Sequence, residues 1–154
     1  MIFLTIFVIT LKTTTMSLVF AFALNNDNQF ENCHFGDSHK FAIYHQNEER
    51  IEFFTEIDNI FRNGKHGDNQ KGNSIIKYLE NLNVNILVSR EFGRNIIMVN
   101  KHFIPVIISK ESPEEVIKVL QDKLHWILDE WNSSNSDYKL FKIKSSVLKL
   151  RIKE

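Results

Sequence analysis

Short runs of apolar residues alternate along this chain with stretches in which apolar residues recur at helical spacing. The first run, residues 17–24, is almost wholly apolar and is closed by the polar residues 25–28, which favours a buried central strand over a helix. Residues 41–44 and 51–54 are further strand candidates, and the polar stretch between them indicates a hairpin. The first part of the chain is therefore expected to form three strands.

The middle of the chain combines helical and strand signals. Residues 64–72 are polar and rich in glycine, which predicts a flexible loop. The loop is expected to lead into a helix, because Asn73 or Ser74 can cap it. The apolar residues that recur at helical spacing after this cap are Ile75, Ile76, Leu79 and Leu82. Further strands are predicted at residues 84–88 and 103–108, with one or two helical turns at 94–100.

The best-marked helix begins at Ser112-Pro113-Glu114-Glu115. These residues supply an N-cap, a proline at the first helical position and the glutamate of a capping box. An apolar stripe then continues to Trp131, over about five turns. A strand, a hairpin and then strand–helix repeats together predict an α/β sheet with an antiparallel portion and helices on its faces.

Size and charge add little to this picture except at the C-terminus. The chain has 154 residues, enough for one domain with one core, and its 19 basic and 19 acidic residues cancel. No nucleic-acid partner is therefore expected. Residues 137–154 differ, since they contain six basic residues and two acidic ones. Apolar residues there alternate with basic ones at 148–153, which predicts an amphipathic strand that either pairs with a sheet edge or stays mobile.

Residues 1–15 form an apolar extension in which no lysine or arginine precedes the apolar run. A secretory signal needs a basic start, and a membrane-spanning helix needs about 20 apolar residues. No membrane span is therefore expected, and we interpret Met16 as the start of translation, with an extra strand or a membrane-adherent extension as the alternative. The predicted organisation is an extension at 1–15, a domain at 16–132 and a basic tail at 133–154.

The residues suited to chemistry gather on two predicted loops. Cys33 and His34 follow the first strand, and His66 lies in the loop before the first helix. In an open α/β sheet such loops meet beyond the carboxyl ends of the parallel strands, and imidazole and thiolate are ligands for iron and other transition metals. Gly36 permits close approach of the backbone. The alternatives are loop packing for His34, an inert buried thiol for Cys33 and a solvated His66.

Cys33 is the single cysteine of the chain. It cannot form an internal disulfide, which fits a reducing, cytoplasmic setting. It also cannot supply the four thiolates that an iron–sulfur cluster normally takes. None of the common phosphate-binding, serine-hydrolase or zinc-protease patterns occurs in the sequence, and no enzymatic activity is expected.

Several short motifs occur in an order typical of one family. They are His34-Phe35-Gly36, Phe41-Ala42-Ile43-Tyr44, the glycine loop and helix start at 65–76, and a strand at 84–89 followed by Glu91-Phe92-Gly93-Arg94-Asn95. With the last strand and helix, the chain from Leu18 to about Trp131 resembles the dinitrogenase iron–molybdenum cofactor-binding family. The resemblance implies a ribonuclease H-like fold, in which helices flank a five-stranded mixed sheet.

The resemblance also implies a function. It suggests a non-enzymatic binding or carrier module for an iron–sulfur-type metallocofactor, which is the iron–molybdenum cofactor or a related cluster held transiently. His34 would be the metal ligand and Cys33 an auxiliary one. The remaining cofactor-binding residues would be Gly36, His66, Gly67 and Gly93, and the partners would be proteins that donate or accept the cluster.

Two other functions fit the same fold. The first is a structural or regulatory interaction domain that binds no ligand and uses the tail as a docking strand. The second is a nuclease, which needs several carboxylates converging on metal ions. The sequence argues against a nuclease, because no acidic residue occurs from Ile96 to Ser109, around the last core strand.

Overall fold

A mixed β-sheet forms the centre of the computed structural model, which describes residues 17–64, 69–133 and 136–150. Its seven strands lie in the order β3-β2-β1-β4-β5-β6-β7. They are β1 (Val19–Leu24), β2 (Lys40–Asn47), β3 (Arg50–Asp58), β4 (Ile86–Ser89), β5 (Ile104–Ile108), β6 (Phe141–Lys144) and β7 (Val147–Leu150). Neighbours from β1 through β4 and β5 to β6 pair in parallel, whereas β2, β3 and β7 join by antiparallel pairing.

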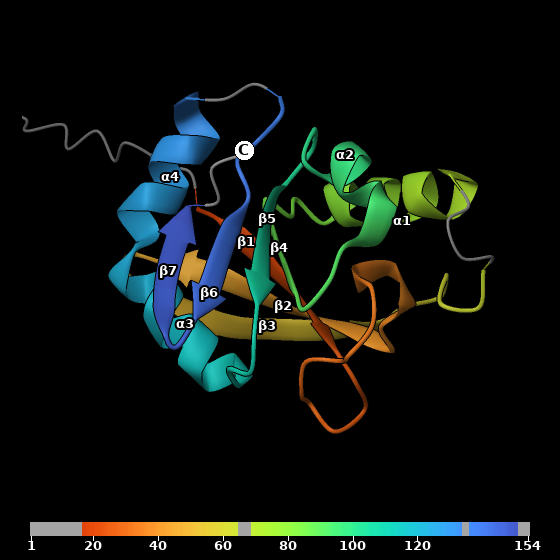
Figure 1. Cartoon of the computed structure of the whole chain (residues 1–154), viewed down its shortest axis with the longest axis horizontal. Coiled ribbons are helices and arrows are strands. Elements are labelled where there is room, and N and C mark those ends of the chain that lie inside the picture. The colour runs from red at the N-terminus through yellow and green to blue at the C-terminus, as the bar shows by residue number, and fades with distance from the viewer. Residues whose placement is uncertain (1–16, 65–68, 134–135, 151–154) are drawn as a thin grey trace, which may run out of the picture.

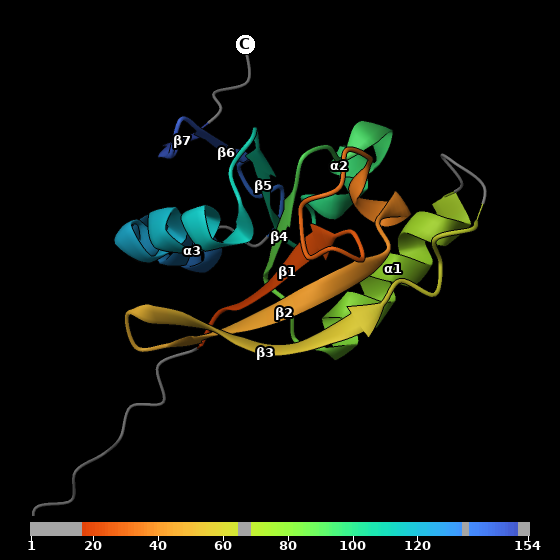
Figure 2. The same cartoon turned by 90° about the horizontal axis from the view of Figure 1, so that it is seen from below.

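Helices cover both faces of the sheet (Figure 1). Helices α1 (Asn69–Asn81) and α2 (Ile96–Val99) lie on one face, and α3 (Pro113–Asp122) and α4 (Leu124–Ser133) lie on the other, as the view in Figure 2 shows. All six residues of β1 are buried, because alternate side chains enter the two separate cores. The predicted α/β class is confirmed.

The strands predicted before residue 110 are confirmed, with shifts of a few residues at their ends. The capping box is confirmed as well, since Ser112 Oγ accepts a hydrogen bond from Glu115 N and Glu115 Oε2 accepts one from Ser112 N. The helix that follows is not continuous, however. It is interrupted at Lys123, whose φ of −121° and ψ of 22° are not helical, and it resumes as α4.

The predicted loop at 64–72 is wrong for residues 69–72, which form the first turn of α1. Gly72 is buried inside this helix, and a Cβ built on it would lie 3.5 Å from Asn95 Nδ2. This distance is an ordinary van der Waals contact, so the packing does not require a glycine here, and Gly72 lies within a helix where sequence reasoning expects a loop.

The basic tail contributes two strands, so the sheet has seven strands where five were predicted. Strand β6 pairs in parallel with β5, with Phe141 beside Val106 and Ile143 beside Ile108. Both tail residues are buried in the core on the α3–α4 side, as is Leu148 of β7. Of the two alternatives for the tail, pairing with a sheet edge is therefore the one observed, and the packed sheet continues beyond residue 132.

No helix in the described ranges is long and apolar enough to cross a membrane. The predictions for residues 1–15 lie outside the described residues.

The five neighbouring strands β3-β2-β1-β4-β5 form a mixed sheet of the predicted size within the larger one. The ribonuclease H-like assignment stays a prediction.

Candidate functional site

The loops after β1 and β4 meet at the carboxyl ends of these two parallel strands. Residue His34 of the first loop forms a parallel bridge with Glu91 of the second, and Phe35 N donates a hydrogen bond of 2.8 Å to Glu91 O. The edge beyond the carboxyl ends of parallel strands is where open α/β sheets bind ligands. Of the predicted site residues, the structure brings His34 and Gly93 together here.

His34 precedes a single 3₁₀ turn, η1 (Phe35–Asp37), and its side chain is 53% exposed. Its imidazole ring lies against the backbone of Gly93, which has a positive φ of 64°. A Cβ built at Gly93 would lie 2.8 Å from both Cε1 and Nδ1 of His34. Glu91 Oε2 lies 3.4 Å from His34 Nε2. The imidazole is thus held against the loop after β4 by Gly93 and Glu91, while it stays open to solvent.

Buried aromatic rings support this loop from beneath. The ring of Phe35 stacks on Phe41 of β2 at 4.8 Å and on Phe92 at 5.6 Å between centroids. The three phenylalanines belong to the core on the α1–α2 side, so they anchor both loops of the site to the same core.

Gly36 packs against α1. A Cβ built at Gly36 would lie 3.2 Å from Ile75 Cδ1, and Gly36 O accepts a hydrogen bond of 2.9 Å from Asn59 Nδ2. These contacts give Gly36 a packing role, and its predicted contact with a cofactor stays a prediction.

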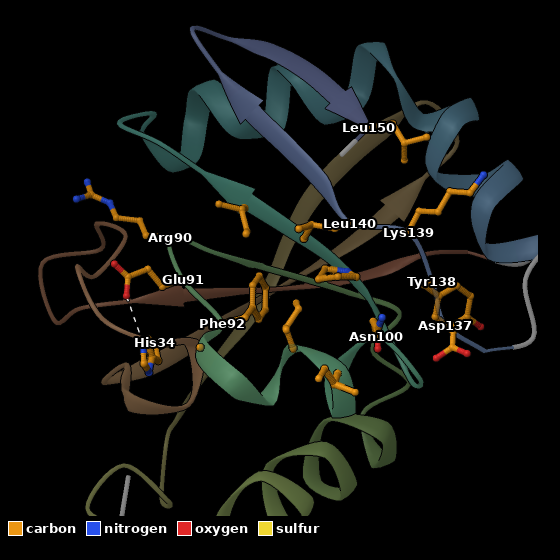
Figure 3. A pocket seen from close by; sticks show the side chains of 15 residues that line it. His34, Arg90, Glu91, Phe92, Asn100, Asp137, Tyr138, Lys139, Leu140 and Leu150 are labelled. Carbon is orange, nitrogen blue, oxygen red and sulfur yellow. Dashed lines mark ion pairs between the residues drawn. The ribbon is translucent and has the colours of Figure 1, made fainter. Parts of the chain in front are cut away.

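Two pockets meet at His34. The larger has a volume of about 1300 Å³ and extends from His34 past residues 90–93 and α2 to β5 and to residues 137–140 of the tail (Figure 3). The smaller has a volume of about 390 Å³ and lies between η1, α1 and the turn at 92–95. His34 and Phe92 line both pockets. Known ligand pockets mostly measure about 300–1000 Å³, so both are large enough for a ligand.

Each pocket is also lined by one arginine, and sequence reasoning singled out neither of these two arginines as a site residue. Arg90 lines the larger pocket and Arg94 the smaller one. The Nε atom of Arg90 is buried and has no hydrogen-bond partner among the described residues. Both arginines lie within three residues of Gly93 in the sequence. This closeness to a predicted site residue was the signal that could have identified them.

Cys33 is half-buried and lines neither pocket. Burial in the first place, and then the carboxylates of Glu31 and Asp37, raise the pKa of its thiol to about 12. Metal ligation requires the thiolate, so the thiol must lose its proton against this environment. The role of Cys33 as an auxiliary ligand stays a prediction that this setting does not support.

His66 and Gly67 lie outside the described residues. In the described ranges no group of three or more His, Cys, Asp and Glu residues is arranged to hold a metal ion. The part of the site that the structure describes is therefore a single exposed imidazole between two pockets, with an arginine in each.

Comparison with known proteins places this site in a family. The family model described as dinitrogenase iron-molybdenum cofactor matches residues 16–123, which include both loops of the site. No curated protein matches the chain. Since the match extends over more than half of the sequence, the chain belongs to the dinitrogenase iron-molybdenum cofactor family.

Proposed function

We propose that this chain is a non-enzymatic carrier that binds an iron–sulfur-type metallocofactor transiently through His34. The observation that carries the proposal is the placement of His34, whose exposed ring lies where two pockets meet at the carboxyl ends of β1 and β4. The family description supports the iron–molybdenum cofactor or a related cluster as the cargo.

The residues present fit a cluster that is assembled elsewhere. One imidazole can coordinate one accessible iron of a preformed cluster, and the cluster's own sulfides complete its structure. Arg90 lines the larger pocket and Arg94 the smaller one, so each of the pockets that meet at His34 has one positively charged residue for a sulfide-rich, anionic cargo. Hydrogen bonds from such groups to sulfides adjust the reduction potential of a cluster.

Release follows from the same geometry. A cargo held by one exposed ligand leaves most of its surface open to a second protein, so a donor or acceptor protein can approach it directly. The partners in this proposal are proteins that donate or accept metalloclusters in the cytoplasm. A ribonuclease H-like core, formed by β1 to β5 with their helices, is the scaffold that we propose for this task.

A second candidate is an interaction domain that carries no ligand. One observation favours it: β7 is the last strand of the described sheet, so its outer edge has no neighbouring strand among the described residues. An exposed strand edge can pair with an extended segment of another protein. Metal analysis of protein purified without oxygen separates the two candidates, because only the carrier retains iron.

Anaerobic titration with a preformed cluster tests the carrier directly. The titration uses the full chain, the His34→Ala variant and, as a control, His125→Ala, which removes an exposed histidine of α4. We expect His34→Ala to weaken cluster binding by about tenfold or more, the size of effect seen when metal sites lose supporting groups, and His125→Ala to bind like the wild type. Equal binding by all three proteins would contradict the proposal.

A further inference from the structure

The larger pocket has a second polar end, remote from His34 (Figure 3). Asn100 lies there at the end of α2, next to Asp137 and Tyr138 of the tail. Tyr138 N donates a hydrogen bond of 2.8 Å to Asn100 O, which fixes the tail against α2. The tail part of this end lies after residue 123, where the family match ends.

Asn100 brings an unsatisfied hydrogen-bond acceptor to this end. The residue is only 8% exposed, and its Oδ1 atom is buried without a hydrogen-bond partner in the described part of the chain. Its backbone is held from both sides, because Asn100 N also donates a hydrogen bond of 2.9 Å to Ile96 O. Buried polar atoms are nearly always paired in folded proteins, so this oxygen, on a residue that lines the pocket, lacks a donor that a ligand can supply.

A second acceptor lies beside the first. Asp137 is exposed and lines the same end of the pocket. The nearby cation, Lys139, directs its side chain away from Asn100 and Asp137 (Figure 3). Among the described residues, no positively charged group lies between the two oxygen acceptors at this end, which favours a cationic donor.

Between the two ends the pocket is lined mainly by apolar side chains. They are Ile96 and Ile97 of the α2 segment, Pro105 and Ile107 of β5, and Leu140 and Leu150 of the tail. An apolar middle beside a pair of acceptors is complementary to a molecule that carries a positive donor on an apolar chain.

We propose that the Asn100–Asp137 end of the larger pocket binds a primary ammonium group carried on an apolar chain. The ammonium donates hydrogen bonds to Asn100 Oδ1 and to the Asp137 carboxylate, and its alkyl chain lies along β5 and Leu140. This subsite is separate from the proposed cluster ligand His34, and it does not require a cluster to be bound. The ammonium group can come from a free amine or from a lysine side chain of a partner protein.

Titration of the cluster-free full chain with hexylammonium, 1-hexanol and hexanoate, followed by calorimetry and by NMR of the backbone amides, tests the subsite. We expect hexylammonium to bind about tenfold or more tightly than hexanol and hexanoate, and to shift the amide signals of Asn100 and Tyr138. Preferential binding of hexanoate, or no binding of hexylammonium, would overturn the proposal. Nα-acetyl-lysine amide is titrated in parallel, and whichever of the two ammonium compounds binds more tightly identifies the source.

Two variants and a control complete the test. Asn100→Leu keeps the approximate shape of the side chain and removes the unpaired oxygen, so it should fold with unchanged or higher melting temperature and bind hexylammonium about tenfold more weakly. Asp137→Asn should weaken binding while the protein stays folded, whereas Asn132→Leu, on the exposed face of α4, should change nothing. A lower melting temperature for Asn100→Leu, or unchanged binding by both pocket variants, would show that Asn100 serves the fold alone.

Discussion

The backbone of Gly93 lies so close to the ring of His34 that a Cβ at position 93 would stand 2.8 Å from His34 Nδ1. Real Cβ contacts are essentially never that short, and the φ of 64° is itself unfavourable for an L side chain. The position of the proposed ligand thus depends directly on the glycine of the second loop.

Replacing Gly93 by alanine should destabilise the protein. The left-handed backbone alone costs an alanine about 1–2 kcal/mol, and the clash with His34 adds to this. We expect the free energy of unfolding to fall by about 2–3 kcal/mol, measured by urea denaturation. The matched control is Gly72→Ala, since a Cβ there meets Asn95 at an ordinary 3.5 Å inside α1.

The control should stabilise the protein by about 0.5–1 kcal/mol, because alanine is favoured over glycine in a helix interior. A Gly93→Ala variant as stable as the wild type would show that the contact between the two loops is not the constraint described above.

The tail strand β6 should be essential to the fold. Phe141→Ala removes a ring that is 3% exposed in the core on the α3–α4 side, and it should lower the free energy of unfolding by about 3–5 kcal/mol. Lys142→Ala, at the neighbouring exposed position, should change it by less than about 0.5 kcal/mol. Similar melting curves for Phe141→Ala and the wild type would mean that the tail does not pack against the sheet in solution.

The thiol of Cys33 should react slowly in the folded protein. Its pKa is raised from 9.0 to about 12, first by desolvation and then by Glu31 and Asp37, so almost no thiolate is present at pH 8. Alkylation by iodoacetamide at this pH should be much slower in the folded protein than in urea.

The same shift sets a pH dependence of stability. Because the folded pKa is above the unfolded one, the unfolded chain releases the proton first as the pH rises. The contribution of Cys33 to stability is complete below pH 9 and should decline between pH 9 and about 12. A Cys33→Ala variant lacks this part of the decline. If iodoacetamide alkylated Cys33 equally fast in the folded protein and in urea, that result would contradict the raised pKa of its thiol.

Local patterns were enough to predict much of the fold. Residues 18–24 are apolar throughout because both faces of β1 are buried, and the capping residues Ser112 and Glu115 act over a single helical turn. Strand β6 was not predicted, since Phe141 and Ile143 are its only apolar residues and they alternate with lysines. Its position depends on parallel pairing with β5, which is distant in sequence.

In the candidate site, too, local sequence patterns identify single residues, while contacts between distant segments cannot be predicted from them. His34 and Gly93 were both predicted, but their contact depends on the pairing of β1 with β4 and has no local signal. The unpaired oxygen of Asn100 likewise exists only because the tail folds back onto the end of α2. The sequence therefore indicates which residues are suited to chemistry, while long-range strand pairing decides which of them meet.

The most direct test of the carrier proposal is to detect the nitrogen that binds the cluster. Protein with isotopically labelled histidine is loaded with a cluster in a paramagnetic state and measured by pulsed electron paramagnetic resonance. The account predicts a coupling from one imidazole nitrogen that is present in the wild type and in His125→Ala and is lost in His34→Ala. A loaded wild-type protein without histidine nitrogen coupling, or a coupling that persists in His34→Ala, would contradict it.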